Sequence, residues 1–270
     1  MLTLMYITNR PEIAMIAQNA GVDRIFIDME SLGKAERQHG LDTVKSSHTI
    51  DDIKKIRKVI SSSELLVRCN SLYAGSKEEI DNIIEAGADV VMLPYFGTAD
   101  DALTFIGLVG GRAKVCLLVE TPQAVENIDE ILALEGIDEV HIGINDLSIG
   151  YGKKFLFEVL ADGTVDYLCD KLRDRGIPYG FGGIASLGRG TLSSEYVIME
   201  HYRLGSTRAI LSRSFCNTDN MRDLNAVRSV FTNGVRSIRE YEEYCMLNSG
   251  RWEENRVQTA RIVERIVSGM

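Results

Sequence analysis

Residues 115–146 read VCLLVETPQAVENIDEILALEGIDEVHIGIND, two short apolar runs separated by one helix-length segment. Short apolar runs that alternate with helical segments are typical of strands in a parallel α/β sheet. The first run ends at Glu120 and the second at Asp146. If these strands are parallel neighbours, both carboxylates emerge at the carboxyl-terminal rim, where α/β folds bind ligands and a hard divalent cation finds oxygen ligands.

The same alternation continues along all 270 residues of the chain. It predicts eight strands, at residues 2–8, 24–29, 64–69, 89–95, 114–120, 139–145, 178–184 and 207–213. Eight βα units in about 250 residues match a closed (β/α)8 TIM barrel, whereas an open doubly wound sheet usually has fewer strands. We therefore expect a single α/β domain over residues 1–270, with the barrel ending at about residue 220.

The segment from about residue 221 to 270 is longer than one closing helix requires. Helical patterning covers Arg222–Leu247 and Trp252–Val267. Additional C-terminal helices commonly dock on another subunit, so we expect a homo-oligomer that assembles through them. Packing of these helices on their own barrel is the alternative explanation.

The amino-acid composition limits which binding partners and which cellular compartment are expected for the protein. A formal net charge of −9 argues against nucleic acid or an anionic membrane as the main partner, because neither attracts an acidic surface. The five cysteines are far apart and mostly have apolar neighbours, which indicates neither a disulfide framework nor a zinc site. With no apolar stretch of membrane-spanning length, the sequence favours a cytoplasmic protein.

Strand parity predicts which side chains face the barrel interior, because successive residues of a strand point in opposite directions. If Glu120 points into the barrel mouth, Leu118 points inward as well. The same count back from Asp146 places Ile142 inward and sends His141 outward, toward the helices, as a packing residue.

Charged residues share the inward parity at the ends of two other strands. Asp28 and Glu30 share it at the end of the second strand, as do Arg68 and Asn70 at the end of the third. Charged groups in such positions need partners, because burying a lone charge is costly.

Two motifs, VETPQAVENI at 119–128 and IDEVHIGINDLS at 137–148, closely resemble the paired signature of the HpcH/HpaI aldolase and citrate lyase family. LVR at 66–68 and MLP at 92–94 add to this resemblance, which runs in matching order from about residue 20 to 185. It implies a TIM barrel and a divalent-metal-dependent carbon–carbon lyase of the class II aldolase type. The implied substrate is a 2-oxo acid such as pyruvate or oxaloacetate.

The resemblance also implies roles for individual residues. Glu120 and Asp146 would bind Mg²⁺, Mn²⁺ or another divalent cation, and Arg68 would contact the oxo group of the substrate. The backbone amides near Asn145 and Asp146 would hold the substrate carboxylate. These residue types suit the chemistry, because a dication and a guanidinium both stabilise the negative charge of an enolate. A Schiff-base aldolase would instead need an inward lysine at a strand end, and the predicted strands offer none.

The chain departs from the family pattern after the second strand. Family aldolases usually carry Asp-Gly-Glu-His there, with the histidine acting in proton transfer beside the aspartate, whereas this chain reads DMES at 28–31. An insertion from Leu32 to Ser46 follows, and SHTIDDI at 47–53 then resembles the histidine and helix start of relatives. We expect His48 to fold back toward Asp28 and take over the displaced role. The insertion also carries basic residues, which either bind an anionic part of the substrate or lie in a solvated loop: Lys34, Arg37, His39 and Lys45.

Simpler explanations exist for each of these residues. Glu120 and Asp146 are also compatible with solvated helix-start carboxylates, and Arg68 with a structural partner of Asp28 or Glu30. His48 is equally compatible with a surface position beside a helix N-cap, and we expect His201, which has no informative sequence context, at the surface.

Two other functions remain open from the sequence. One is a citrate-lyase-like lyase that acts on malyl or 3-hydroxyacyl thioesters of CoA. The other is a non-catalytic metal-binding barrel that lost its proton-transfer step with the missing histidine.

The glycine-rich segment GFGGIA at 180–185 also has two interpretations. Loops after strands seven and eight of barrels often bind a phosphate or carboxylate, and this segment lies at that point. Glycines that permit close packing and tight turns are the alternative.

Overall fold

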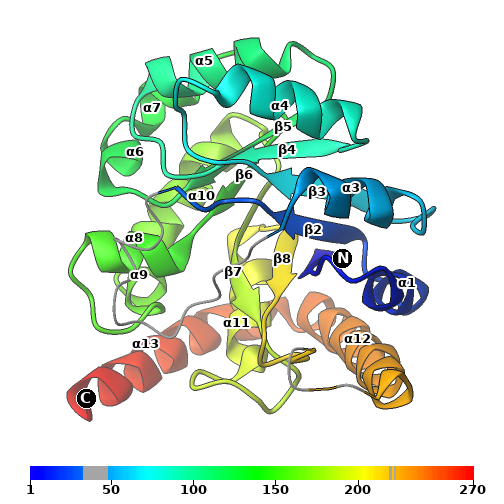
Figure 1. The fold of residues 1–270 in the computed structure, drawn as a ribbon. Coiled ribbons are helices and arrows are strands. Elements are labelled where there is room, and N and C mark those ends of the chain that lie inside the picture. Colours follow the sequence, from blue (N-terminus) through cyan, green and yellow to red (C-terminus); the bar gives the residue numbers. More distant parts are fainter. Residues whose placement is uncertain (33–47, 219–220, 222) are drawn as a thin grey trace.

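The computed structural model describes residues 1–32, 48–218, 221 and 223–270, and these residues form a closed barrel of eight parallel strands (Figure 1). The strands follow chain order around the barrel: β1 Thr3–Ile7, β2 Arg24–Asp28, β3 Glu64–Arg68, β4 Val90–Leu93, β5 Lys114–Val119, β6 Glu139–Ile142, β7 Tyr179–Ile184 and β8 Arg208–Leu211. β1 pairs with β8 and so closes the ring. The predicted TIM barrel and all eight strand positions are confirmed, although most strands end one to three residues earlier than predicted.

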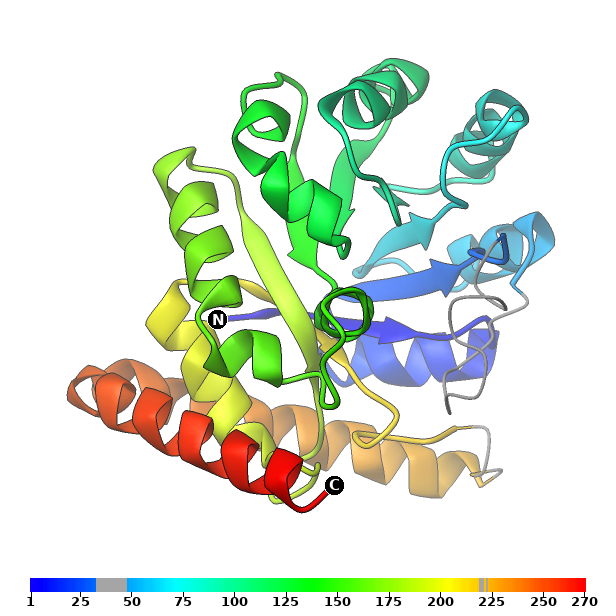
Figure 2. The same cartoon turned by 90° about the vertical axis from the view of Figure 1, so that its left-hand side faces the viewer.

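Helices surround the barrel (Figures 1 and 2). Their bounds are α1 Pro11–Asn19, α3 Ile50–Arg57, α4 Ser76–Glu85, α5 Ala99–Val109, α6 Pro122–Glu126, α7 Ile128–Ile131, α8 Ile144–Gly150, α9 Glu158–Ala161, α10 Thr164–Asp174, α11 Ser194–Leu204, α12 Leu224–Leu247, the 3₁₀ turn η1 Ser249–Arg251, and α13 Trp252–Ser268. Thr49 and Thr98 begin α3 and α5 with complete capping boxes, which satisfy free backbone N–H groups of the first turn.

Two apolar clusters result from the alternation of side chains along the strands. The inner cluster fills the barrel with Met5, Phe26, Leu66, Val90, Met92, Cys116 and Leu118. The outer cluster packs the other face of the strands against the helices. Below the inner cluster, the guanidinium of Arg24 pairs with both Glu64 and Glu139, and Arg208 also bonds Glu139. These ion pairs lie at the amino-terminal ends of the strands. They fill that end of the barrel interior, and the inner apolar cluster fills its middle.

Strand six corrects one prediction. His141 lies beside Leu118 in the register between β5 and β6, so it points into the barrel, whereas Ile142 belongs to the outer cluster. The count from Asp146 failed because β6 ends at Ile142 and the chain turns at Gly143 into helix α8. A two-residue alternation does not continue through a helical turn.

The glycines of strand seven allow close packing. A Cβ atom on Gly180 would lie 2.4 Å from the carbonyl oxygen of Arg208, and one on Gly182 would lie 2.6 Å from Cδ1 of Ile144. Gly182 also has a φ of +53°, which most residues avoid. The geometry therefore supports the packing interpretation of this glycine-rich segment.

Both C-terminal helices pack on their own barrel. Figures 1 and 2 show α12 (orange) and α13 (red) on the same side of the molecule as α11. Arg239 of α12 donates to the carbonyl of Leu2 and pairs with Asp23, while Asn255 of α13 bonds Glu200 of α11. These contacts explain the helical extension within one chain, and assembly through it remains a prediction.

All five cysteines are buried free thiols, as the sequence indicates. Within the described ranges, no helix is both long enough and apolar enough to cross a membrane.

We expect the buried histidines to destabilise the protein in acid. His201 is buried rather than exposed, with its ring stacked on Phe181 at 3.9 Å between centroids. Burial lowers the pKa of His141 to about 4 and that of His201 to about 3, both from 6.5. Below pH 6.5 these two side chains therefore bind protons in the unfolded chain that they do not bind in the folded chain, so their contribution to the free energy of unfolding falls as the pH drops toward 4.

The contribution of His141 to the free energy of unfolding falls by at most about 3 kcal/mol between neutral pH and pH 4. Urea unfolding of the wild type and of His141→Met at pH 7.5 and 4.5 measures this loss as the difference between their two pH dependences, because the variant lacks the imidazole. An unchanged dependence in that variant would show that His141 does not contribute.

Candidate functional site

Arg68 lies at the carboxyl end of β3 between two carboxylates. Its Nε and Nη2 donate to Oδ1 and Oδ2 of Asp28, both at 2.9 Å, and Nη2 lies 3.3 Å from Oε2 of Glu30. The guanidinium carbon also lies 5.8 Å from the centre of the Phe26 ring. Burial opposes the charge of Arg68, but Asp28, Glu30 and then Glu120 outweigh it and raise its pKa. The predicted pairing of these inward charges is therefore present, and it holds the guanidinium in one orientation.

Glu120 follows β5 and is 3% exposed, so its carboxylate lies inside the barrel mouth. The pKa of Glu120 is raised to about 8, chiefly by burial; Arg68 opposes the rise, and the charges of Asp146 and Glu30 add to it. The ionised carboxylate is therefore disfavoured in this buried site. Such a site would gain from a bound cation.

Two backbone features fit around the Glu120 carboxylate. Tyr95 has a φ of +48°, and its N–H donates to Oε1 of Glu120 at 3.0 Å. This conformation is uncommon for a tyrosine and costs of order 1 kcal/mol. On the other side, a Cβ atom on Gly143 would lie 2.8 Å from Oε2 of Glu120, so only glycine fits there. Gly143 is visible in the sequence as a glycine within the apolar run that precedes Asp146, whereas no feature of the sequence indicates a role for Tyr95.

Asn145 and Asp146 lie in the first turn of α8 rather than at the end of a strand. Leu147 donates the first hydrogen bond of this helix, to the carbonyl of Gly143. The N–H groups of the preceding residues therefore have no acceptor within the helix. The structure brings Asp146 close enough to Glu120 for its charge to raise the Glu120 pKa.

The donor set fits a hard divalent cation. Within the residues that the structure describes, no three His, Cys, Asp or Glu side chains form a metal cage. Two carboxylates in an open site are nevertheless sufficient for Mg²⁺, which keeps several waters and leaves positions for a substrate. The raised pKa of Glu120 is the structural sign that this position favours added positive charge.

His48 folds back against the second strand. The backbone N–H of Asp28 donates to Nδ1 of His48 at 3.0 Å. His48 also directly precedes Thr49, the N-cap of α3. His48 thus folds back toward Asp28 and also lies beside a helix N-cap, the two positions that the sequence suggested. Its role in proton transfer remains a prediction. Lys34, Arg37, His39 and Lys45 of the insertion lie outside the described residues.

Asn70 is a site neighbour whose partners the sequence did not reveal. Its Oδ1 accepts hydrogen bonds from the N–H groups of Ser31 and Leu32, and its Nδ2 donates to Glu79 of α4. Strand parity predicts that Asn70 points inward, but parity alone does not predict its hydrogen-bond partners.

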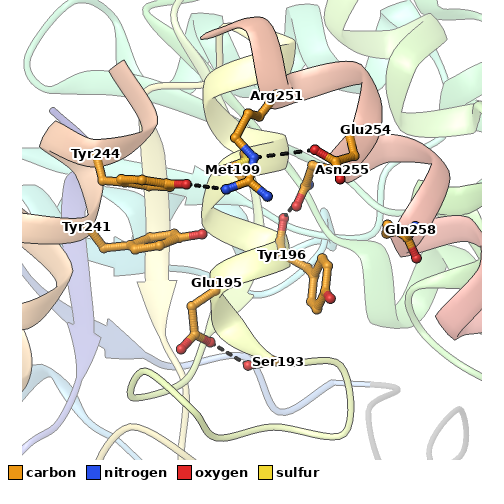
Figure 3. Close-up of a pocket in the computed structure, with 10 residues that line it drawn as sticks. All are labelled: Ser193, Glu195, Tyr196, Met199, Tyr241, Tyr244, Arg251, Glu254, Asn255 and Gln258. Atoms are coloured by element: carbon orange, nitrogen blue, oxygen red, sulfur yellow. Dashed lines mark hydrogen bonds and ion pairs between the residues drawn. The ribbon is translucent and has the colours of Figure 1, made fainter. Parts of the chain in front are cut away.

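A separate hollow of about 430 Å³ lies between α11, α12 and α13 (Figure 3). Tyr241 and Tyr244 stack along it with ring centres 5.5 Å apart, and Arg251 bonds both Tyr244 and Glu254. It shares no residue with the carboxylates of the barrel mouth.

Comparison with known proteins gives a family match over more than half of the chain. The model of the family described as HpcH/HpaI aldolase/citrate lyase matches residues 2–155. This range includes Asp28, His48, Arg68, Glu120 and Asp146.

Characterised relatives match over a similar portion. A 2-keto-3-deoxy-L-rhamnonate aldolase of Salmonella gallinarum is 27% identical over 172 residues, which cover 52% of this chain and 58% of the relative. A hydroxypyruvate/pyruvate aldolase of Agrobacterium fabrum is 30% identical over 169 residues with the same coverages. The chain thus spans somewhat over half the length of the curated relatives it matches.

Solved structures match over most of the chain. An HpcH/HpaI aldolase from Desulfitobacterium hafniense superposes with a TM-score of 0.61 at 17% identity, covering 88% of this chain and 93% of that one. A family protein from Burkholderia cenocepacia gives a TM-score of 0.62 at 16% identity, covering 84% and 95%. At these identities, the likeness supports the barrel fold.

Proposed function

Because the chain belongs to the HpcH/HpaI aldolase/citrate lyase family, we propose that it is a divalent-cation-dependent carbon–carbon lyase acting on a 2-oxo acid such as pyruvate or oxaloacetate. The observation that carries this proposal is the buried carboxylate of Glu120, whose pKa is raised to about 8 beside Asp146 and opposite Arg68. The names of the relatives, which are aldolases of 2-oxo acids, support the same class of reaction.

Glu120 and Asp146 are the residues that would hold Mg²⁺ or Mn²⁺. When bound, the cation would supply Lewis acidity at the oxo group of the substrate. Each carboxylate must be deprotonated to act as a ligand, so cation binding at Glu120 would depend on pH.

Arg68 is the protein's own source of positive charge at this point. Cleaving or forming a bond next to a ketone places negative charge on the oxo oxygen in an enolate, and a fixed guanidinium stabilises that charge. Asp28 and Glu30 keep the guanidinium in place before substrate binds, so no reorganisation is needed during the reaction. Asn145 and Asp146 lie in the first turn of α8, where backbone amides point away from the helix, and these amides would hold the substrate carboxylate.

A Schiff-base mechanism has no support in the strands, since none of the eight carries a lysine at its carboxyl end. Lys114 begins β5 at the opposite end of the barrel and pairs with Glu64.

Proton exchange tests the proposed function directly. In D₂O, the protein with Mg²⁺ should exchange the methyl protons of pyruvate, which proton NMR follows, and EDTA should stop this exchange. Arg68→Ala should slow it by about 100-fold or more, because the enolate charge loses its guanidinium. Arg112→Ala removes a half-exposed guanidinium that pairs with Asp81 and serves as the matched control.

Exchange that persists without any cation would contradict the proposal. Cation binding without exchange of any 2-oxo acid would indicate a non-catalytic barrel. Retention on a CoA matrix together with thioester cleavage would indicate the acyl-CoA lyase.

Two substitutions at His48 separate proton transfer from simple contact. His48→Ala should slow pyruvate exchange by about 100-fold or more if the ring moves a proton. The amide oxygen of Asn can accept the Asp28 N–H bond but cannot transfer a proton, so His48→Asn should be equally slow. Normal exchange in His48→Asn would show that only the contact with Asp28 matters.

A further inference from the structure

We propose that Asn70 and Glu79 are positioning residues for Arg68, acting through the segment that carries Glu30. This inference rests on the proposed function, because it assigns Arg68 an active role. Asn70 lies two residues after Arg68, at the same end of β3, and Glu79 lies in the first turn of α4. Neither is placed to carry out the reaction itself, since both are bonded to other parts of the protein.

The amide oxygen of Asn70 holds the chain just beyond Glu30. It accepts the N–H of Ser31 at 2.8 Å and that of Leu32 at 2.9 Å, and the Ser31 hydroxyl lies 3.3 Å away. Two successive backbone donors converge on one oxygen atom. This fixes the path of the segment as it leaves the barrel mouth.

Glu79 fixes the orientation of that amide. Its Oε1 accepts from Nδ2 of Asn70 at 2.8 Å and from the N–H of Asn70 at 3.1 Å. With Nδ2 committed to Glu79, the oxygen of Asn70 must face Ser31 and Leu32. Burial raises the pKa of Glu79, so the carboxylate is shielded from water where it makes these bonds.

The held segment is the one that surrounds the guanidinium. Met29 donates to the carbonyl of Arg68 at 3.0 Å, Glu30 donates to Oδ1 of Asp28 at 3.2 Å, and the Glu30 carboxylate pairs with Nη2 of Arg68. Residues 28–32 are thus tied to Arg68 at one end and to Asn70 at the other. Without Asn70, the chain just beyond Glu30 loses its hydrogen bonds at Ser31 and Leu32, so the Glu30 carboxylate is held less firmly beside Arg68.

A displacement of this kind affects rate more than folding. Moving a catalytic group by about 1 Å can cost a factor of about 100 in rate. The inference therefore predicts a change in kcat from residues that do not touch the substrate.

Asn70→Asp is the most informative substitution. The new carboxylate can still accept from Ser31 and Leu32, but its second oxygen faces the carboxylate of Glu79 and repels it. The double variant Asn70→Asp with Glu79→Gln removes this repulsion, because a glutamine amide can donate to Asp and accept from the backbone N–H. Asn248→Asp, at the end of α12, is the matched control, since the side-chain amide of Asn248 donates to the carbonyl of Tyr244 in its own helix.

Pyruvate exchange kinetics measure the effect. Asn70→Asp should lower kcat about tenfold or more while KM changes by less than about threefold, and the double variant should return to within about threefold of wild type. Normal kcat in Asn70→Asp would overturn the proposal. So would a double variant no faster than Asn70→Asp while its melting temperature matches wild type, because the loss would then not arise from the Asn70–Glu79 contact.

A second readout does not depend on activity. The Nε–H proton of Arg68, assigned by its absence in Arg68→Lys, should give a slowly exchanging NMR signal because it donates to Asp28. Asn70→Asp should shift or broaden this signal, and the double variant should restore it. If the wild-type protein shows no exchange activity, the proposed function fails and this signal alone decides whether the two residues position Arg68. An unchanged signal in Asn70→Asp would overturn the inference.

Discussion

The arrangement of the barrel mouth depends on the ion pairs that hold buried carboxylates around one guanidinium. Four carboxylates, from Asp28, Glu30, Glu120 and Asp146, act on one another or on the guanidinium of Arg68. Arg68 pairs closely with only two of them, Asp28 and Glu30. Burial is the largest cause of the raised pKa of Glu120, and the charges of Asp146 and Glu30 add to it. A divalent cation beside Glu120 would offset these effects.

The fold makes this concentration of acids possible. Parallel strands deliver their carboxyl ends to one rim, so side chains far apart in sequence meet there without long loops. The base of the barrel is closed by a separate set of ion pairs around Glu139, and the apolar inner cluster lies between the two charged layers. Tyr95 adopts an unfavourable left-handed backbone conformation, which directs its N–H toward Glu120.

Much of this could be predicted from the sequence, because periodicity and parity are local properties. The eight strands, the inward direction of Glu120 and the pairing of Arg68 with acids at the end of β2 all followed from such patterns. Strand six was misread because a strand that ends at Ile142 and one that continues to Asn145 have similar apolar sequences. His141 was misplaced for that reason. The contacts of Asn70 and Tyr95 depend on loops that meet only in three dimensions, and a single sequence gives no signal for them.

Cation binding tests the central claim most directly. Electron paramagnetic resonance of free Mn²⁺ during titration should show one ion bound per chain, more tightly as the pH rises toward 8, where Glu120 loses its proton. Glu120→Gln and Asp146→Asn should each weaken binding by about tenfold or more, equivalent to about 1.4 kcal/mol. Glu126→Gln, an exposed glutamate on the neighbouring helix α6, should bind as wild type does. Wild-type affinity in both the Glu120 and Asp146 variants would contradict the account.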